Sequence, residues 1–504
     1  MTVGDGATTG DVGYTRLIDP RRKWYSNRRL IALHAWIALL LITSFNNGYD
    51  GSMINGLQTL PQWKDYFHSP SGSMLGLLNA IQNIGSLTAY PFSPYLADGL
   101  GRKKTVFIGA VILCVAPVIQ AAAQSVGMFI GARFLIGFGL TFGASAAPML
   151  ITEIAYPPYR GPLTSAYNSL WYSGAAIAAW STFGTFKIKD TSSWRIPSAL
   201  QALPAVLQVI LVLVGPESPR WLISKGKDKL ALDTLAYYHA DGNRDDPLVQ
   251  YEFHEIKNAL DFDHTVAASM GWRALVATPG NGLVSYYLSK VFDSIGITDP
   301  TTQLLINGIL QIWNLGWALL AAALCDRLGR RLLFLTSAVG MLVFFTMQTI
   351  CSAEFAIHGS HAAAHTVIAF IFLFYASYDL AFTPLIISYS IEILPFPLRA
   401  KGFTVFNFAV SLSIIFNQYV NPVALDAIQW KYYVVYCCWL AFELIFLYFF
   451  VIETKNRTLE ETSALFDGQG ASQLQYGVSV DILSPSDKSS GSLCEPVDIS
   501  IVSL

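Results

Sequence analysis

Four side chains capable of chemistry lie inside otherwise apolar stretches of the sequence: Asp50, Arg133, Asn168 and Asp379. An ionisable or amide group costs free energy in an apolar environment, so each must face a partner or a water-filled path. A carboxyl group can exchange a proton for a nearby cation, and an amide can hydrogen-bond a hydroxyl group in both directions. These residues indicate ligand binding and proton exchange. The sequence has no metal-ligand spacing, nucleotide loop or nucleophile elbow, which argues against covalent catalysis.

Asp50 and Arg133 are expected at a comparable depth in two different helices. Asp50 lies near the outer half of the first apolar run, and Arg133 lies in the fourth. A carboxylate that alternates between Arg133 and a proton would form a proton-coupling site. A permanent ion pair that only locks two helices together is the alternative. We favour the proton-coupling interpretation.

Asn168, Trp171 and Tyr172 have a spacing that places them on one stripe of a helix. An amide and aromatic rings on one stripe suit an uncharged polyol, because amides bind hydroxyl groups and rings stack on the apolar faces of sugars. Ordinary packing is the alternative. Further amides lie in apolar runs and favour a neutral solute over an ionic one: Gln82, Gln311, Asn314, Asn407, Asn417 and Gln418.

Membrane-spanning helices are the elements that must position these residues. The chain has 504 residues, 53% of them hydrophobic and 13% charged, and its mean hydropathy is +0.44, which is too apolar for an ordinary soluble protein. Small residues at 137, 139, 143, 144, 146 and 147 allow close helix contact in the fourth run. The apolar runs long enough to cross a bilayer are 30–54, 73–96, 105–124, 127–150, 162–186, 195–214, 303–324, 332–352, 363–390, 402–424 and 430–452.

Charged motifs occur twice, once in each half of the chain. Their separations are 228, 239 and 236 residues for the pairs Asp98 and Asp326, Glu153 and Glu392, and Trp194 and Trp430. Parallel repeats of this size indicate that a six-helix unit was duplicated in tandem, as in transporters.

The distribution of Lys and Arg orients the chain. With twelve crossings and both termini inside, the short inside segments carry most of the basic residues, including Arg102 and Lys103, whereas the outside segments hold only Lys64, Lys187, Lys189, Arg195, Lys290 and Lys431. We therefore divide the chain into a cytoplasmic tail (1–29), a first half (30–214), a cytoplasmic linker (215–271), a second half (272–452) and a largely disordered cytoplasmic tail (453–504). His358, His361 and His365 fall in a predicted outside loop, and we assign no metal to them.

Several of these motifs together resemble the sugar porter signature of the major facilitator superfamily. They are Arg133, Gly137, Gly139, Pro148, Glu153, Arg160 and Gly161, the loops at 98–104 and 326–331, and the segments 216–220 and 453–460. The resemblance covers about residues 30–465 and is greatest to fungal lactose permease-like and hexose transporters. It implies an all-α membrane protein of twelve transmembrane helices in two six-helix halves, a sugar and a proton as partners, no cofactor, no nucleic acid and a multi-pass location in the cell membrane.

The resemblance also implies roles for individual residues. Asp50 occupies the position where proton-coupled porters have an aspartate, and Asn168 stands where many members have a sugar-binding glutamine; Ile387 replaces the family's tryptophan. The expected substrate-binding set is Asn168, Trp171, Tyr172, Asn281, Tyr286, Tyr287, Asp379, Asn407 and Asn417. The expected gating set, at the cytoplasmic helix ends, is Arg102, Glu153, Arg160, Arg330, Glu392 and Arg399.

The seventh span, near residues 274–292, is expected to be short and broken. From Leu30 to Asp98 there are 68 residues, but from Arg273 to Asp326 there are only 53, and the glutamine run of the family is absent. A helix needs about 20 apolar residues to cross a bilayer, and Pro279 weakens this one further. A mis-spliced gene model and a genuine deletion that impairs transport are the two explanations.

The expected activity is proton-coupled uptake of a mono- or disaccharide by a protein that is not an enzyme. A facilitative uniporter and a transporter of another polyol-like metabolite are alternatives. A non-transporting sugar receptor would be expected to have a long signalling tail, whereas the tail here has about 50 residues.

Overall fold

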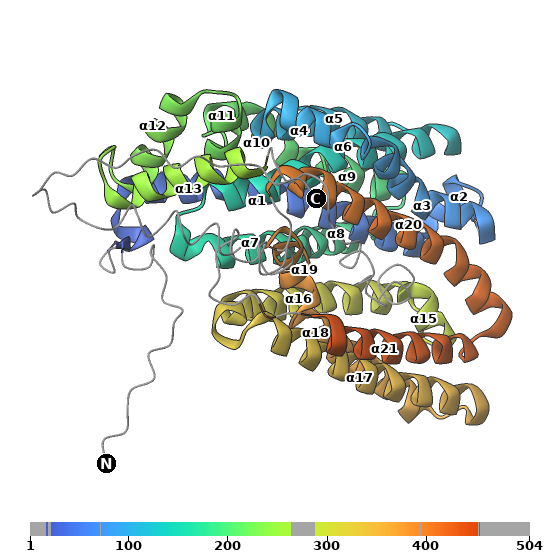
Figure 1. The fold of residues 1–504 in the computed structure, drawn as a ribbon. Coiled ribbons are helices and arrows are strands. Elements are labelled where there is room, and N and C mark those ends of the chain that lie inside the picture. The colour runs from blue at the N-terminus through green and yellow to red at the C-terminus, as the bar shows by residue number, and fades with distance from the viewer. Residues whose placement is uncertain are drawn as a thin grey trace, which may run out of the picture.

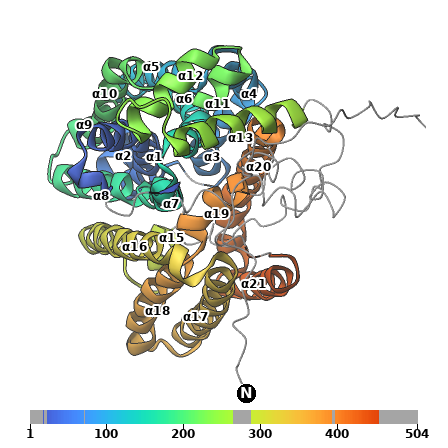
Figure 2. The same cartoon turned by 60° about the vertical axis from the view of Figure 1, so that its left-hand side comes forward.

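The computed structural model describes residues 17–18, 22–70, 72–263, 288–392, 396–451 and 453. The described elements are all helices, and they form two groups that lie side by side (Figures 1 and 2). The first group contains α1 (Arg28–Thr59), α2 (Pro61–Tyr66), α3 (Gly72–Ala89), α4 (Ser93–Leu100), α5 (Arg102–Ala121), α6 (Val126–Ile154), α7 (Arg160–Ser169), α8 (Trp171–Thr185), α9 (Ser192–Leu200) and α10 (Leu203–Leu211). The second contains α15 (Leu288–Ser294), α16 (Pro300–Leu328), α17 (Arg330–His358), α18 (His361–Asp379), α19 (Phe382–Glu392), α20 (Phe396–Ile428) and α21 (Lys431–Phe450).

Nine helical segments of the described chain are long and apolar enough to cross a membrane. Two more expected spans are present as broken pairs, α3 with α4 and α7 with α8. The first pair is interrupted around Pro91 and the second at Leu170. Most of the expected seventh span, including Asn281, Tyr286 and Tyr287, lies outside the described residues, and α15 is the described helix that follows it.

Glycines allow helices of the first half to touch backbone to backbone. A Cβ on Gly137 of α6 would lie 1.8 Å from the carbonyl oxygen of Gln82 in α3, and one on Gly48 of α1 would lie 1.8 Å from that of Trp171 in α8. No larger side chain fits at either place. Small residues thus serve here as they do in other membrane bundles, where close approach increases van der Waals contact.

The duplicated motifs form the same capped helix start in both halves, in which a glycine precedes the helix and a glutamate binds its N-terminus. α5 and α17 each begin just after a glycine with positive φ (103° and 89°). Glu217 accepts a hydrogen bond from the backbone N–H of Lys103 (3.3 Å), and Glu453 accepts one from that of Arg330 (2.9 Å). A carboxylate at a helix N-terminus satisfies free N–H groups and complements the helix dipole. The repeat expected from sequence is therefore seen in the tertiary structure.

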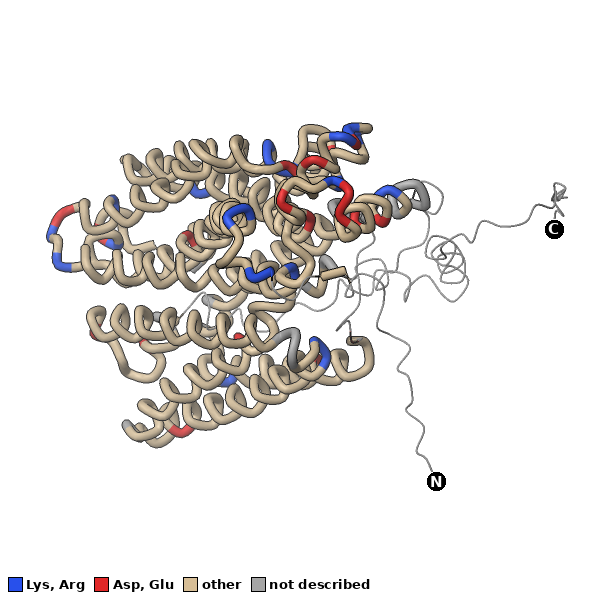
Figure 3. Tube along the Cα trace, turned by 90° about the vertical axis from the view of Figure 1, so that its left-hand side faces the viewer, with Lys and Arg blue, Asp and Glu red and all other residues tan. Residues whose placement is uncertain are grey.

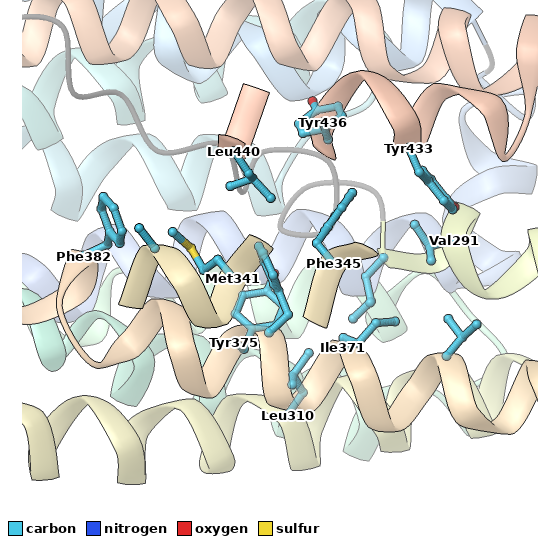
Figure 4. Packing of buried hydrophobic residues seen from close by; sticks show 14 of the residues in the cluster. Val291, Leu310, Met341, Phe345, Ile371, Tyr375, Phe382, Tyr433, Tyr436 and Leu440 are labelled. Atoms are coloured by element: carbon cyan, nitrogen blue, oxygen red, sulfur yellow. The ribbon is translucent and has the colours of Figure 1, made fainter. Parts of the chain in front are cut away.

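The core of the second half consists of large apolar and aromatic side chains. Met341 and Phe345 of α17 pack with Ile371 of α18 and with Tyr436 and Leu440 of α21 (Figure 4). Phe345 and Tyr436 have ring centroids 5.9 Å apart. This packing holds α17, α18 and α21 together as one unit.

Three short helices follow the first half: α11 (Pro219–Ser224), α12 (Asp228–His239) and α13 (Pro247–Asp263). They have a small core of their own, which includes Trp221, Leu235 and Val249. The indole of Trp221 donates to the carbonyl of Asp98 (2.9 Å), which ties them to the first half. We call the end of the bundle at which α11, α12 and α13 lie the linker end. Figure 3 shows charged residues gathered at the helix ends and in these short helices, and few along the long helices.

Candidate functional site

A cavity of about 290 Å³ lies between the two halves. Its wall in the first half comes from α1, α3, α6, α7 and α8, and its wall in the second half from α16, α18, α19 and α20. The halves also meet directly beside it: Asn83 donates to Gln418 (3.1 Å), and Ser411 donates to Tyr90 (3.3 Å). Both halves therefore contribute to one site.

Amides, hydroxyl groups and aromatic rings line this cavity. None of the described residues in its wall is Asp, Glu, Lys, Arg or His. The amides in the wall are Asn47, Asn55, Gln82, Asn83, Asn168, Gln311, Asn314, Asn407 and Asn417. Such a wall can satisfy many hydroxyl groups but offers nothing to neutralise a charge.

Asn314 is the amide best placed to bind a ligand, and the expected substrate set did not include it. Its side chain is 0% exposed, and neither its amide oxygen nor its amide nitrogen has a hydrogen-bond partner among the described residues. A buried amide without partners is costly unless a ligand or water satisfies it. Its place in an apolar run was visible in the sequence, but its orientation and lack of partners were not.

Asn168, Trp171 and Tyr172 all line the cavity, close to the break between α7 and α8. The Nδ2 of Asn168 donates to the backbone carbonyl of Thr383 in α19, so this amide bridges the two halves. The rings of Trp171 and Tyr172 meet edge to face at 5.1 Å. A ligand that used Asn168 would have to compete with the contact to Thr383.

Asn407 and Asn417 also line the cavity from α20. Their amide nitrogens are used by their own helix, since they donate to the carbonyls of Phe403 (2.9 Å) and Ser413 (3.0 Å). Each amide nitrogen has a second N–H that can still serve a ligand, as can the oxygens, although that of Asn417 already accepts from Tyr436 (3.0 Å). Ile387 is in the same wall, where the family resemblance implies a tryptophan.

Asp50 and Arg133 form a buried ion pair next to the cavity. Nη2 of Arg133 lies 3.3 Å from Oδ2 of Asp50, and both side chains are 1% exposed. The Nε of Arg133 donates to the carbonyl of Leu78 (3.0 Å), and Gln201 donates to Oδ1 of Asp50 (3.1 Å). Gly51 and Ser52, the residues after Asp50, line the cavity. The pair is thus one residue removed from the cavity wall.

Asp379 does not line the cavity. It ends α18, is 0% exposed and accepts a hydrogen bond from the hydroxyl group of Thr383 (2.6 Å). Thr383 and Tyr172, which also interacts with Asp379, separate it from the cavity.

The charges at the linker end pair both within the expected gating set and with residues outside it. Glu153 contacts Arg102 (3.4 Å), and Arg102 also contacts Asp98 (3.1 Å). Arg160, which follows the turn after α6, contacts Glu252 of α13 (3.5 Å). The side chains of Glu392 and Arg399 lie outside the described part of the chain.

Glu252 and His239 form a buried pair beside Arg160, a member of the expected gating set. Nδ1 of His239 lies 2.7 Å from Oε2 of Glu252, and its Nε2 lies 3.2 Å from the carbonyl of Ile154. Burial raises the pKa of Glu252, but His239, Arg160 and Arg220 more than offset this effect, and the net pKa is lowered. Nothing in the sequence of the polar linker shows that this carboxylate is buried against the end of α6.

Comparison with known proteins identifies the family. The family described as "Sugar (and other) transporter" matches residues 36–466. The chain belongs to this sugar transporter family. It is 28% identical over 459 residues to the MFS-type transporter oryC of Aspergillus oryzae, with 84% of each chain covered. It is 26% identical over 461 residues to the high-affinity glucose transporter of Kluyveromyces lactis, covering 83% of this chain and 82% of that protein.

Other relatives of this sugar transporter carry different solutes. The high-affinity gluconate transporter ght3 of Schizosaccharomyces pombe is 25% identical over 463 residues, with 85% of this chain and 82% of that protein covered. The solved structure of the proton:xylose symporter XylE bound to 6-bromo-6-deoxy-D-glucose has a TM-score of 0.76 at 24% identity, covering 86% of this chain and 98% of XylE. The expected all-α major facilitator fold is confirmed. The protein is a multi-pass membrane transporter rather than an enzyme.

Proposed function

We propose that the protein is a secondary transporter that carries an uncharged sugar, a mono- or disaccharide, together with a proton into the cell. The observation that carries the proposal is the cavity between the halves, whose described lining has many amides and hydroxyl groups and no ionic side chain. Its volume of about 290 Å³ is near the lower end for small-molecule sites. Sites of this kind lie at the interface of the repeats in transporters that work by alternating access.

Asn314 supplies the anchor of the proposed sugar site. Its buried amide is free to pair with two hydroxyl groups, and Trp171 gives an apolar surface on the opposite half. A sugar held between them would link the two halves, which is how a substrate can favour closure around itself.

The pair of Asp50 and Arg133 is the proposed proton-coupling site. An ionised Asp50 is stabilised by Arg133 at 3.3 Å, and a protonated Asp50 would release the guanidinium. Because Asp50 is adjacent to residues of the cavity wall, its protonation or ionisation would alter the proposed sugar site. XylE, which shares the fold, is a proton:xylose symporter, and this supports the assignment.

The proposed membrane is the cell membrane, with both termini and the linker end in the cytoplasm. The excess of Lys and Arg in the segments on that side supports this orientation. The charge contacts of Arg102, Glu153, Arg160 and Glu252 then belong to a cytoplasmic gate. The other residues of the expected gating set, Arg330, Glu392 and Arg399, are its proposed counterpart in the second half.

An uptake screen in yeast that lacks its own sugar transporters tests the proposal. Labelled hexoses, pentoses, disaccharides and one sugar acid are offered, and the pH of an unbuffered medium is followed when each is added. We expect saturable uptake of a neutral sugar with alkalinisation of the medium. Uptake without any pH change identifies a facilitative uniporter, and transport of the sugar acid alone overturns the assignment of a neutral substrate.

A matched pair of variants on α16 tests the site. Asn314→Ala removes the buried amide, whereas Ile312→Ala changes a side chain that is 52% exposed on the outside of the same helix. We expect Asn314→Ala to raise KM for the sugar by about 5- to 150-fold, because one or two hydrogen bonds to the sugar are lost. Ile312→Ala should have little effect on KM. Equal kinetics for the two variants would exclude Asn314 from the site.

A further inference from the structure

A second buried carboxyl group lies at the interface between the halves. Asp379 ends α18, just before the break that separates it from α19, and its side chain is 0% exposed. Thr383, one turn further along, donates to its Oδ1 at 2.6 Å. Tyr172 of α8 interacts with the same carboxyl group from the first half. Asp379 is therefore enclosed by residues of both halves.

The described groups that face this carboxyl carry no positive charge. The hydroxyl group of Thr383 and the phenol of Tyr172 from α8 contact it, and Tyr172 in turn lies near the phenols of Tyr375 and Tyr378 of α18. No described Lys, Arg or His forms an ion pair with Asp379, whereas Asp50 in the first half has Arg133. Its Oδ2 is buried without a well-aligned hydrogen bond.

An ionised carboxylate in this position would have no cationic partner among the described residues. Transfer of an isolated ionised carboxylate to an apolar interior costs so much that the group takes up a proton instead. Asp50 avoids this cost because Arg133 neutralises it and Gln201 donates to it. The two buried aspartates thus lie in opposite electrostatic environments. We propose that Asp379 is a second proton-binding site of this transporter, occupied in the present conformation and emptied when the two halves separate around it.

The contacts that cover Asp379 are those that a rocking motion of the halves would break. Asn168 of α7 donates to the backbone carbonyl of Thr383, the same residue whose hydroxyl group donates to Asp379. Tyr172 packs with Ala175 and Ala318 where α8 meets α16. Movement of α7 and α8 away from α16 and α19 would admit water to the carboxyl group, which would then release its proton to that water. A sugar that competed for Asn168 would act on the same contact.

Infrared spectroscopy of the purified full-length protein tests the protonation. A protonated carboxylic acid has a carbonyl stretch distinct from that of a carboxylate, and the band shifts in D₂O. At neutral pH we expect such a band in the wild type and in Asp50→Asn, and its loss in Asp379→Asn. Identical spectra for the wild type and Asp379→Asn would show that Asp379 is ionised and would overturn the proposal.

A second variant keeps the test decisive if Asp379→Asn does not fold. Thr383→Val retains the carboxyl group but removes the hydroxyl group that donates to it at 2.6 Å. The carbonyl band should remain and move in frequency. A spectrum unchanged in this region would mean that the protonated acid is not Asp379.

The link to transport rests on the proposed function and needs a separate measurement. In proteoliposomes, the proton-to-sugar ratio is obtained from the membrane potential at which net sugar flux reverses. We expect Asp379→Asn to couple one proton fewer per sugar than the wild type, and an unchanged ratio would refute the emptying step. If no sugar is transported at all, the proposed function fails, but the infrared band still decides whether Asp379 holds a proton.

Discussion

Arg133 of α6 and Asp50 of α1 face each other at 3.3 Å inside the first half, and each side chain is 1% exposed. The guanidinium also donates to the carbonyl of Leu78, so a third helix, α3, fixes its position. The pair thus joins three helices at a point next to the cavity wall. This position is what the proposed coupling site requires, since Asp50 would exchange the guanidinium for a proton next to the sugar.

Asp50→Asn should abolish sugar-driven proton entry while part of the sugar exchange remains. Asparagine keeps the size of the side chain and can still accept from Gln201, but it cannot titrate. The measurement is alkalinisation of the medium on addition of sugar, with counterflow of labelled sugar as the control. Alkalinisation as large as that of the wild type would contradict a coupling role for Asp50.

Arg133→Ala should be more damaging than Asp50→Asn. Removal of one member of a buried pair leaves the other charge unpaired, which typically costs about 3–5 kcal/mol. We expect low expression and a lower melting temperature in detergent. The double variant Asp50→Asn with Arg133→Gln leaves no buried charge at this place and should recover much of the expression. Normal expression and transport by Arg133→Ala would disprove the importance of the pairing.

Arg160→Glu should change the rate of transport rather than the affinity for sugar. Arg160 contacts Glu252 at 3.5 Å at the linker end and does not line the cavity. A partly exposed pair is worth about 0.2–1 kcal/mol, so its loss changes the balance between conformations by about 1.5- to 5-fold. We expect a changed maximal rate with sugar preference intact, and the same for Arg399→Glu. A selective change of sugar preference would argue against a gating role.

Glu252 should make the protein sensitive to acid at the linker end. Although burial raises its pKa, the net pKa lies below the ordinary value of 4.5 because of His239, Arg160 and Arg220. A carboxylate with a lowered folded-state pKa stabilises the protein above its unfolded pKa, and this stabilisation is lost as the pH falls through the folded-state pKa. We expect Glu252→Gln to melt at a lower temperature than the wild type at pH 7. The difference should shrink below about pH 4.5, and a constant difference across this range would exclude Glu252 as its source.

The origin of the short seventh span can be determined from the transcript, and its effect from the transport activity. Sequencing of the messenger RNA across codons 278–283 distinguishes a splicing error from a genuine deletion. If the 504-residue form is the natural one, we expect weak transport, because a seventh span shorter than about 20 apolar residues would not cross the bilayer fully. Robust sugar uptake by this form would refute a functional defect.

The sequence by itself determined the membrane class, the duplication and the sugar transporter family. These are properties of the chain read along its length: apolar runs of helix length, charges at their ends, and the same motifs in both halves. The position of Asp50 and Arg133 in two apolar runs was enough to predict a pair, because two such charges in a membrane interior must find each other or water.

Only the tertiary structure decided which side chains meet. Arg160 faces Glu252, Asp379 lies behind the cavity wall, and the amide of Asn314 has no partner among the described residues. Each outcome depends on how a helix is rotated about its axis and on which distant helix packs against it. Those rotations are set by contacts such as Gly137 against Gln82 and Asn168 against Thr383, which join residues far apart in the chain. Hydropathy and motif spacing carry no information about them, because the same apolar helix can present any of its faces to its neighbours.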